Sequence, residues 1–177
     1  MKKRTGRLAL AGVLTALALV FLLLTVSPLA TVGLAALAGV CGIPVVVELG
    51  RKAGLVHFAA AALLALLIVP TVEGKGMYIA FFGWYTVFKA WIENKNLSRP
   101  VEWGIKIAAF AAAVSAYGAV WVFLLTMPLP TWLTLWMLPL LAVGLCGVFV
   151  LYDIGLTGII GTYHSRIRPK INGIFRF

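Results

Sequence analysis

The sequence predicts an all-α integral membrane protein with six transmembrane helices and both termini in the cytoplasm. Of its 177 residues, 63% are hydrophobic and 11% are charged, whereas soluble domains are about 45–50% apolar and about 25% charged. The mean hydropathy is +1.06. A soluble fold of this size would still expose about 30% of its unfolded surface, which is too much for so apolar a chain. Disorder is excluded because disordered chains are poor in apolar residues.

The first two helices are predicted over residues 8–26 and 29–47. The first run carries no charge and is as long as the roughly 20 residues that a bilayer core requires. It follows a basic segment, but it exceeds the roughly 7–15 residues of a signal-peptide core, so we expect it to remain as a helix. Ser27 and Pro28 separate the two helices, since proline interrupts helical hydrogen bonding.

The third and fourth helices are predicted over residues 53–69 and 77–92. Residues 70–76 contain proline and two glycines and are expected to form a polar loop between them. The fourth run is short and aromatic. Lys89 lies near its end, where a long side chain is expected to snorkel to the inner interface.

The fifth and sixth helices are predicted over residues 107–126 and 133–163. A polar stretch precedes the fifth helix, and two prolines separate it from the sixth. Residues 164–177 are expected to form a basic cytoplasmic tail. No internal repeat of the transporter type is present, so residues 1–177 are predicted to be a single membrane domain.

The distribution of basic residues predicts the orientation. With the N-terminus in the cytoplasm, fourteen Lys and Arg lie on the inner side and only Lys75 lies outside. Orientation follows this bias in short loops, so the prediction is a multi-pass protein of the cell membrane. The same rule accounts for the net charge of +10, and no nucleic-acid partner is expected.

The sequence does not favour an enzyme, a metal site or a cofactor. His57 and His164 have no Glu or Cys at helical spacing, as a zinc site would require. Cys41 and Cys146 lie far apart in apolar runs. Hydrolase, thiol-redox and Walker A motifs are absent. Ionisable residues are expected near the inner interface rather than at mid-depth, which does not favour an ion-driven carrier.

Aromatic and polar residues gather at the predicted outer end, where two interpretations stay open. Tyr78, Phe82 and Tyr85 share one helical face with Lys89. Such a face could line a cleft that stacks a flat heterocycle beside one acid and one base, or it could belong to an interfacial aromatic belt. The candidate substrate-binding residues are Glu73, Lys75, Tyr78, Phe82, Tyr85, Trp132 and Trp136.

A second group of polar residues is predicted at the inner end. It comprises Glu48, Arg51, Lys52, Lys89, Glu93, Arg99, Glu102, Lys106 and Asp153. The group either docks a partner, with Glu93 and Asp153 as the candidate residues, or consists of charges paired within the chain. Asp153 ends a long apolar run and is expected to have a cationic neighbour.

Gly12 and Ala16 form a small-x-x-x-small pair in the first helix. Such pairs allow close approach of helix backbones, either for packing within the bundle or for docking of a partner.

This combination resembles the substrate-binding S components of energy-coupling factor (ECF) vitamin transporters. The first helix, at residues 8–20, is similar to the N-terminal helix of that family, whose small-x-x-x-small motif meets the transmembrane T component. Gly12 and Ala16 occupy the two positions, with Gly in place of the usual Ala.

The resemblance implies uptake of a small vitamin-like or heterocyclic nutrient by a chain that binds the substrate but is energised by others. The implied partners are a T component and two ATPase subunits, besides the substrate and membrane lipid. The implied pocket faces outward and is built by the outer loops and the fourth to sixth helices, and the S component topples to release its substrate. The alternative from the residues is a non-transporting accessory or scaffold protein that docks a partner through the inner charges.

Overall fold

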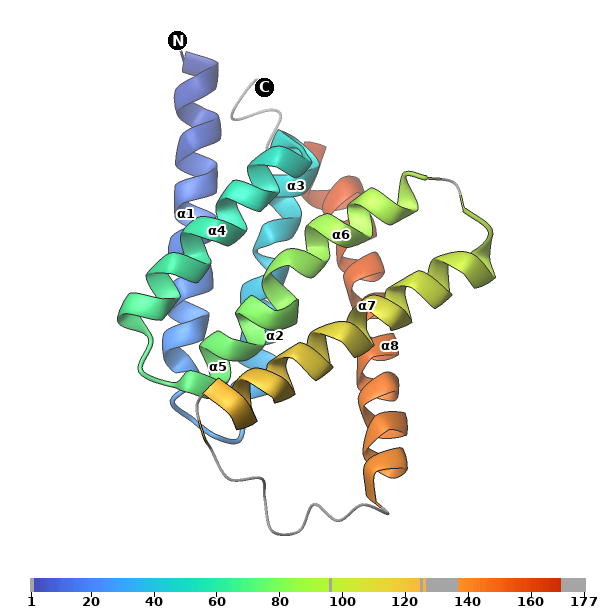
Figure 1. Ribbon diagram of the computed structural model, residues 1–177. Coiled ribbons are helices and arrows are strands. Elements are labelled where there is room, and N and C mark those ends of the chain that lie inside the picture. Colours follow the sequence, from blue (N-terminus) through green and yellow to red (C-terminus); the bar gives the residue numbers. More distant parts are fainter. Residues whose placement is uncertain (1, 96, 125, 127–136, 170–177) are drawn as a thin grey trace.

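The computed structural model describes residues 2–95, 97–124, 126 and 137–169, and the regular elements in this part of the chain are helices. They form six successive helical rods (Figure 1). In chain order the rods are α1 (Lys2–Leu24); α2 (Thr31–Val40) with α3 (Gly42–Leu49); α4 (Arg51–Ile68); α5 (Val72–Met77) with the π-helical η1 (Tyr78–Phe82) and α6 (Gly83–Glu93); α7 (Arg99–Ala119) with the π-helical η2 (Val120–Leu124); and α8 (Leu138–Thr162) with the π-helical η4 (Tyr163–Ile167).

Five of these rods contain helices long and apolar enough to cross a membrane. The five segments are Gly6–Leu24, Thr31–Leu49, Arg51–Ile68, Arg99–Phe123 and Pro139–Arg166. The predicted class, an all-helical protein compatible with several membrane crossings, is therefore confirmed at this level.

The fourth rod, α5–η1–α6, is not among the five and lies inside the bundle. It packs against α2, α4 and α7, and Tyr78, Phe81 and Tyr85 are among its buried side chains. The outer rods instead expose large apolar side chains, such as Leu67 on α4 at 83% and Val143 on α8 at 71%. Because protein surrounds much of the fourth rod, it can carry polar side chains that would be costly against lipid.

Three helices begin five or more residues earlier than predicted. The first starts at Lys2 and not at residue 8. The fourth rod starts at Val72 and not at residue 77, because Gly74 packs directly on Thr25 at the end of α1, where any Cβ would overlap the threonine side chain. The fifth rod starts at Arg99 and not at residue 107. Pro100 lies in its first turn, a position that suits proline because the first amide protons of a helix have no intrahelical partner.

The beginning of α1 and the end of η4 lie at the same end of the bundle (Figure 1). The turn between α3 and α4 is also at this end and consists of Gly50, whose φ of 88° is a left-handed conformation that favours glycine. We call this end the N-terminal end. The opposite end, formed by the connections around residues 25–31 and 69–71, is called the distal end.

The buried core consists of two clusters of different composition. Between α1, α2 and α4, five alanines are completely buried: Ala18, Ala35, Ala38, Ala61 and Ala65. Small side chains allow these helices to approach closely. Around η1, α6, α7 and α8 the core is aromatic and includes Phe81, Tyr85 and Phe149.

Candidate functional site

Buried ion pairs join α6, α7 and α8. The Lys89 ammonium lies 2.6 Å from Oδ1 of Asp153 in α8, and the Lys106 ammonium lies 3.3 Å from Oδ2 of the same carboxylate. The Tyr85 hydroxyl donates a hydrogen bond of 2.7 Å to the same carboxylate. The side chains of Lys89, Lys106 and Asp153 are only 1%, 2% and 4% exposed. The prediction of a cationic neighbour for Asp153 is confirmed.

Two further carboxylates close this group toward the N-terminal end. Glu93 lies 2.8 Å from Lys89 and 3.0 Å from Lys106, and Glu102 lies 2.6 Å from Lys106. Glu93 is 37% exposed and Glu102 is 23% exposed. The group therefore runs from a buried centre at Asp153 to a partly exposed rim, and we call these five charged residues the ion-pair network.

The position of Lys89 differs from the sequence prediction. The expectation that it snorkels to the interface is wrong, because its ammonium also donates to the Asp153 carbonyl at 3.3 Å and is enclosed by protein. At 1.5 Å per residue, Asp153 lies about 21 Å from the end of η4, near the middle of the apolar segment Pro139–Arg166. The expectation that ionisable residues lie only near the ends of the apolar segments is therefore wrong for Asp153. Glu93 and Asp153, predicted as docking residues, are thus placed to bind this chain's own helices together, and a docking role for them stays a prediction.

Tyr78 and Tyr85, two of the predicted substrate-binding aromatics, are completely buried. Phe82 is partly buried and packs edge-on against Tyr152, with ring centroids 5.1 Å apart. These rings follow one another along the fourth rod as predicted, but Tyr78 and Tyr85 lie in the core and do not face an open cleft.

The polar residues of the predicted outer site lie at the distal end. Glu73 is exposed on α5, and the Lys75 ammonium donates to the Val69 carbonyl at 3.0 Å. Trp132 and Trp136 lie outside the described residues.

An apolar cleft lies between the distal halves of α2, η1, α7 and α8. Its volume is about 290 Å³, and its walls include Phe81, Phe82, Phe110, Ala113 and Tyr117. The Phe110 ring also stacks on the Phe149 ring of α8, with ring centroids 4.7 Å apart. Of the predicted site residues, Phe82 lines this cleft. Helical spacing places the α7 residues on one face, but only the packed structure shows that this face meets η1 and α8.

Gly12 and Ala16 line a different groove, between α1 and α4. The groove has a volume of about 780 Å³, and Thr15 and His57 contribute to its walls. A Cβ added to Gly12 would meet no atom within 4 Å. The side of α1 that packs in the bundle carries other residues, such as Ala18. Within the described residues, the small-residue pair is therefore left open and is not used for internal packing.

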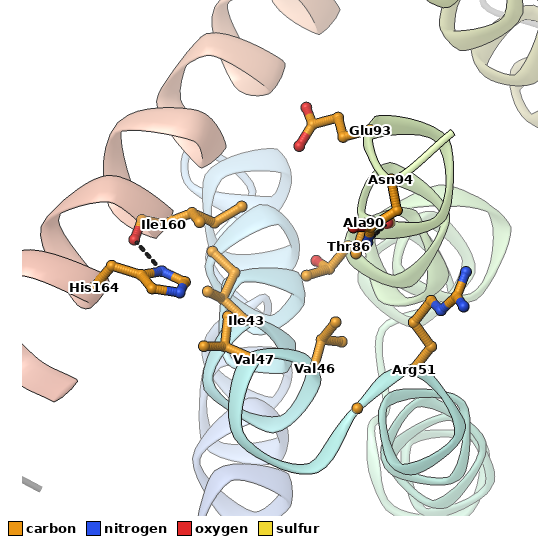
Figure 2. A pocket seen from close by; sticks show the side chains of 11 residues that line it. Ile43, Val46, Val47, Arg51, Thr86, Ala90, Glu93, Asn94, Ile160 and His164 are labelled. Atoms are coloured by element: carbon orange, nitrogen blue, oxygen red, sulfur yellow. Dashed lines mark hydrogen bonds between the residues drawn. The ribbon is translucent and has the colours of Figure 1, made fainter. Parts of the chain in front are cut away.

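A fourth feature is a cavity of about 470 Å³ at the N-terminal end, between α3, α6 and the end of α8 (Figure 2). Ile43 and Ile160 form apolar walls, while Glu93 and Asn94 at the end of α6 form a polar edge. His164 is held by a contact of 3.2 Å between its Nδ1 and the Ile160 carbonyl. The cavity could not be predicted from the sequence, because its lining residues come from distant segments.

Within the described residues, no group of three His, Cys, Asp or Glu side chains could hold a metal ion. No family model matches the chain, and no curated protein or solved structure is significantly similar to it. The ion-pair network, the apolar cleft, the groove at Gly12 and Ala16 and the cavity at the N-terminal end are therefore the features that can indicate a function.

Proposed function

We propose that this chain is a six-span protein of the cell membrane, with both termini cytoplasmic, that binds a small heterocyclic nutrient for uptake. In this proposal it acts like an ECF S component, and a separate T component with ATPase subunits supplies the energy. The fourth rod would be a membrane span in addition to the five long apolar segments. It is helical over 22 residues, Val72–Glu93, and is enclosed by the other rods. The beginning of α1 and the end of η4 lie at the same end of the bundle, which agrees with an even number of crossings (Figure 1).

The apolar cleft at the distal end is the observation that carries the proposal. It is bounded by the fourth, fifth and sixth rods, the part of the bundle where the resemblance implies a substrate pocket. Its volume of about 290 Å³ is at the lower limit of ligand sites, roughly 300–1,000 Å³. The rings of Phe81, Phe82 and Phe110 supply faces and edges on which a small flat molecule can stack.

The groove at Gly12 and Ala16 supports the second half of the proposal, the docking of a T component. A helix from a partner can approach the α1 backbone closely at these two residues because no side chain of the described chain covers them. The scaffold alternative is not favoured by a comparable observation, because Glu93, Glu102 and Asp153 are paired with lysines of this chain.

The docking half is tested by Gly12→Trp, with Val13→Trp as the matched control. Val13 is 66% exposed and is not part of the groove. We expect Gly12→Trp to abolish co-purification of an ATPase-bearing complex from native membranes and to abolish uptake, while Val13→Trp retains both. Equal complex recovery and uptake for the two variants would exclude docking through this groove.

A further inference from the structure

A groove on the surface of the bundle, between the first half of α4 and the outer side of α6, is not used by the proposed function. Its volume is about 430 Å³. We call it the α4–α6 groove. Its main lining residues are Arg51, Lys52, Leu55, Trp84, Phe88 and Trp91.

Three cations lie in or beside this groove. Arg51 and Lys52 begin α4, and the Lys95 ammonium lies 3.7 Å above the centre of the Trp91 ring. None of the three forms an ion pair with a described residue. The chain has five acidic residues, of which Glu93, Glu102 and Asp153 pair with Lys89 or Lys106, Glu48 pairs with Arg168, and Glu73 lies at the distal end.

The groove changes character along its length. Arg51, Lys52 and Trp91 lie at the N-terminal end, whereas Leu55 and Trp84 lie about one to two helical turns further into the bundle. The Trp84 indole N–H donates to the Ala80 carbonyl at 2.8 Å, so its ring presents an apolar surface. Arg51 lines both this groove and the cavity on the inner side of α6, and Figure 2 shows its side chain on the opposite side of that cavity from Ile160 and His164.

We infer that the α4–α6 groove binds one anionic phospholipid from the leaflet at the N-terminal end. The phosphate lies between Arg51 and Lys52, where the start of α4 adds a positive helix dipole, and an acyl chain follows Leu55, Trp84 and Phe88. Basic pockets between transmembrane helices recognise anionic headgroups in this way. Under the proposed topology this is the cytoplasmic leaflet, but the binding itself does not depend on the proposed uptake function.

The test uses native mass spectrometry of the purified full chain with equal amounts of phosphatidylglycerol and phosphatidylcholine of identical acyl chains. A basic residue near a membrane surface favours anionic lipid by about 1 kcal/mol, or about fivefold. For the first lipid bound, we therefore expect phosphatidylglycerol to be preferred by about 25-fold through the two cations. The variant Arg51→Gln/Lys52→Gln should lose this preference.

Arg99→Gln/Arg166→Gln is the matched control, since it removes the same charge from exposed residues outside the groove. It should keep the preference. Leu55→Trp leaves the charges in place but fills the apolar part, and should reduce retained phosphatidylglycerol at least fivefold. A preference that survives Arg51→Gln/Lys52→Gln, or that falls equally in the control, would overturn the inference.

An excess of sn-glycerol 3-phosphate separates a lipid from a free phosphate ester. It carries the phosphate without acyl chains and should leave the phospholipid bound. Displacement by this compound would overturn the assignment to a lipid.

Discussion

Replacing Lys89 by methionine removes one of the two ammonium groups of the ion-pair network. The variant would leave three carboxylates around Lys106 alone. Asp153, whose side chain is 4% exposed, would keep only the longer 3.3 Å contact to Lys106 and the Tyr85 hydrogen bond. Removing one partner of a buried ion pair lowers the free energy of unfolding by about 3–5 kcal/mol, because the other charge stays buried without a partner.

Two neutralisations of the acidic partners calibrate this prediction. Asp153→Asn changes the network from three carboxylates and two ammonium groups to two of each, so the charges become balanced and the loss of stability should be smaller than for Lys89→Met. Glu102→Gln removes a carboxylate that is 23% exposed, while Lys106 keeps Glu93 and Asp153. Partly exposed pairs contribute about 0–1 kcal/mol, so this variant should be the mildest of the three.

The assay is thermal unfolding in detergent micelles supplemented with lipid. For a protein of this length, a loss of 1 kcal/mol lowers Tm by about 2–4 °C, so Lys89→Met should lower Tm by about 6–20 °C. The double variant Lys89→Met/Asp153→Asn should cost less than the sum of the two single changes, since it removes both members of one pair. Equal Tm losses for Lys89→Met and Glu102→Gln would refute the reasoning.

Two further predictions use pairs of similar residues in different surroundings. Tyr85→Phe removes a hydrogen bond to a buried carboxylate and should lower the free energy of unfolding by about 1.5–3 kcal/mol. Tyr78→Phe should be neutral or stabilising, because that hydroxyl is buried without a hydrogen-bond partner among the described residues. Chemical denaturation measures both variants, and equal losses of stability would contradict the assignment of the Tyr85 hydrogen bond. Gly39→Ala should lower Tm clearly, because the added Cβ would overlap the Phe82 carbonyl oxygen, while Gly12→Ala, which meets open space, should not. Equal Tm values for these two variants would show that α2 and the fourth rod are not in close contact.

The apolar runs predict the rods that face lipid, because those surfaces must be apolar along their whole length. The predicted third span, residues 53–69, differs from α4 (Arg51–Ile68) by at most two residues at each end. The same criterion fails at the start of the fourth rod. Gly74 is compatible with a loop by its residue type, and only its close contact with Thr25 explains why it lies in a helix.

Only part of the candidate site could be predicted, because its remaining contacts also depend on tertiary packing. The need of Asp153 for a cation follows from its place after an apolar run, but its partners Lys89 and Lys106 lie 64 and 47 residues away in sequence. Which helices are neighbours is a tertiary property that periodicity does not encode. The small-residue pair at Gly12 and Ala16 is visible in the sequence, whereas its exposure in a groove is not.

Native mass spectrometry of the gently purified protein tests the central proposal most directly, using two variants of adjacent alanines in α7. Ala113 lines the apolar cleft, whereas Ala112 is exposed and outside it. The proposal predicts one small heterocyclic molecule per chain in the unmodified protein and in Ala112→Phe, and none in Ala113→Phe, with gel filtration confirming that all three are folded. A folded, unmodified protein without such a ligand, or a ligand retained equally by Ala113→Phe, would contradict it.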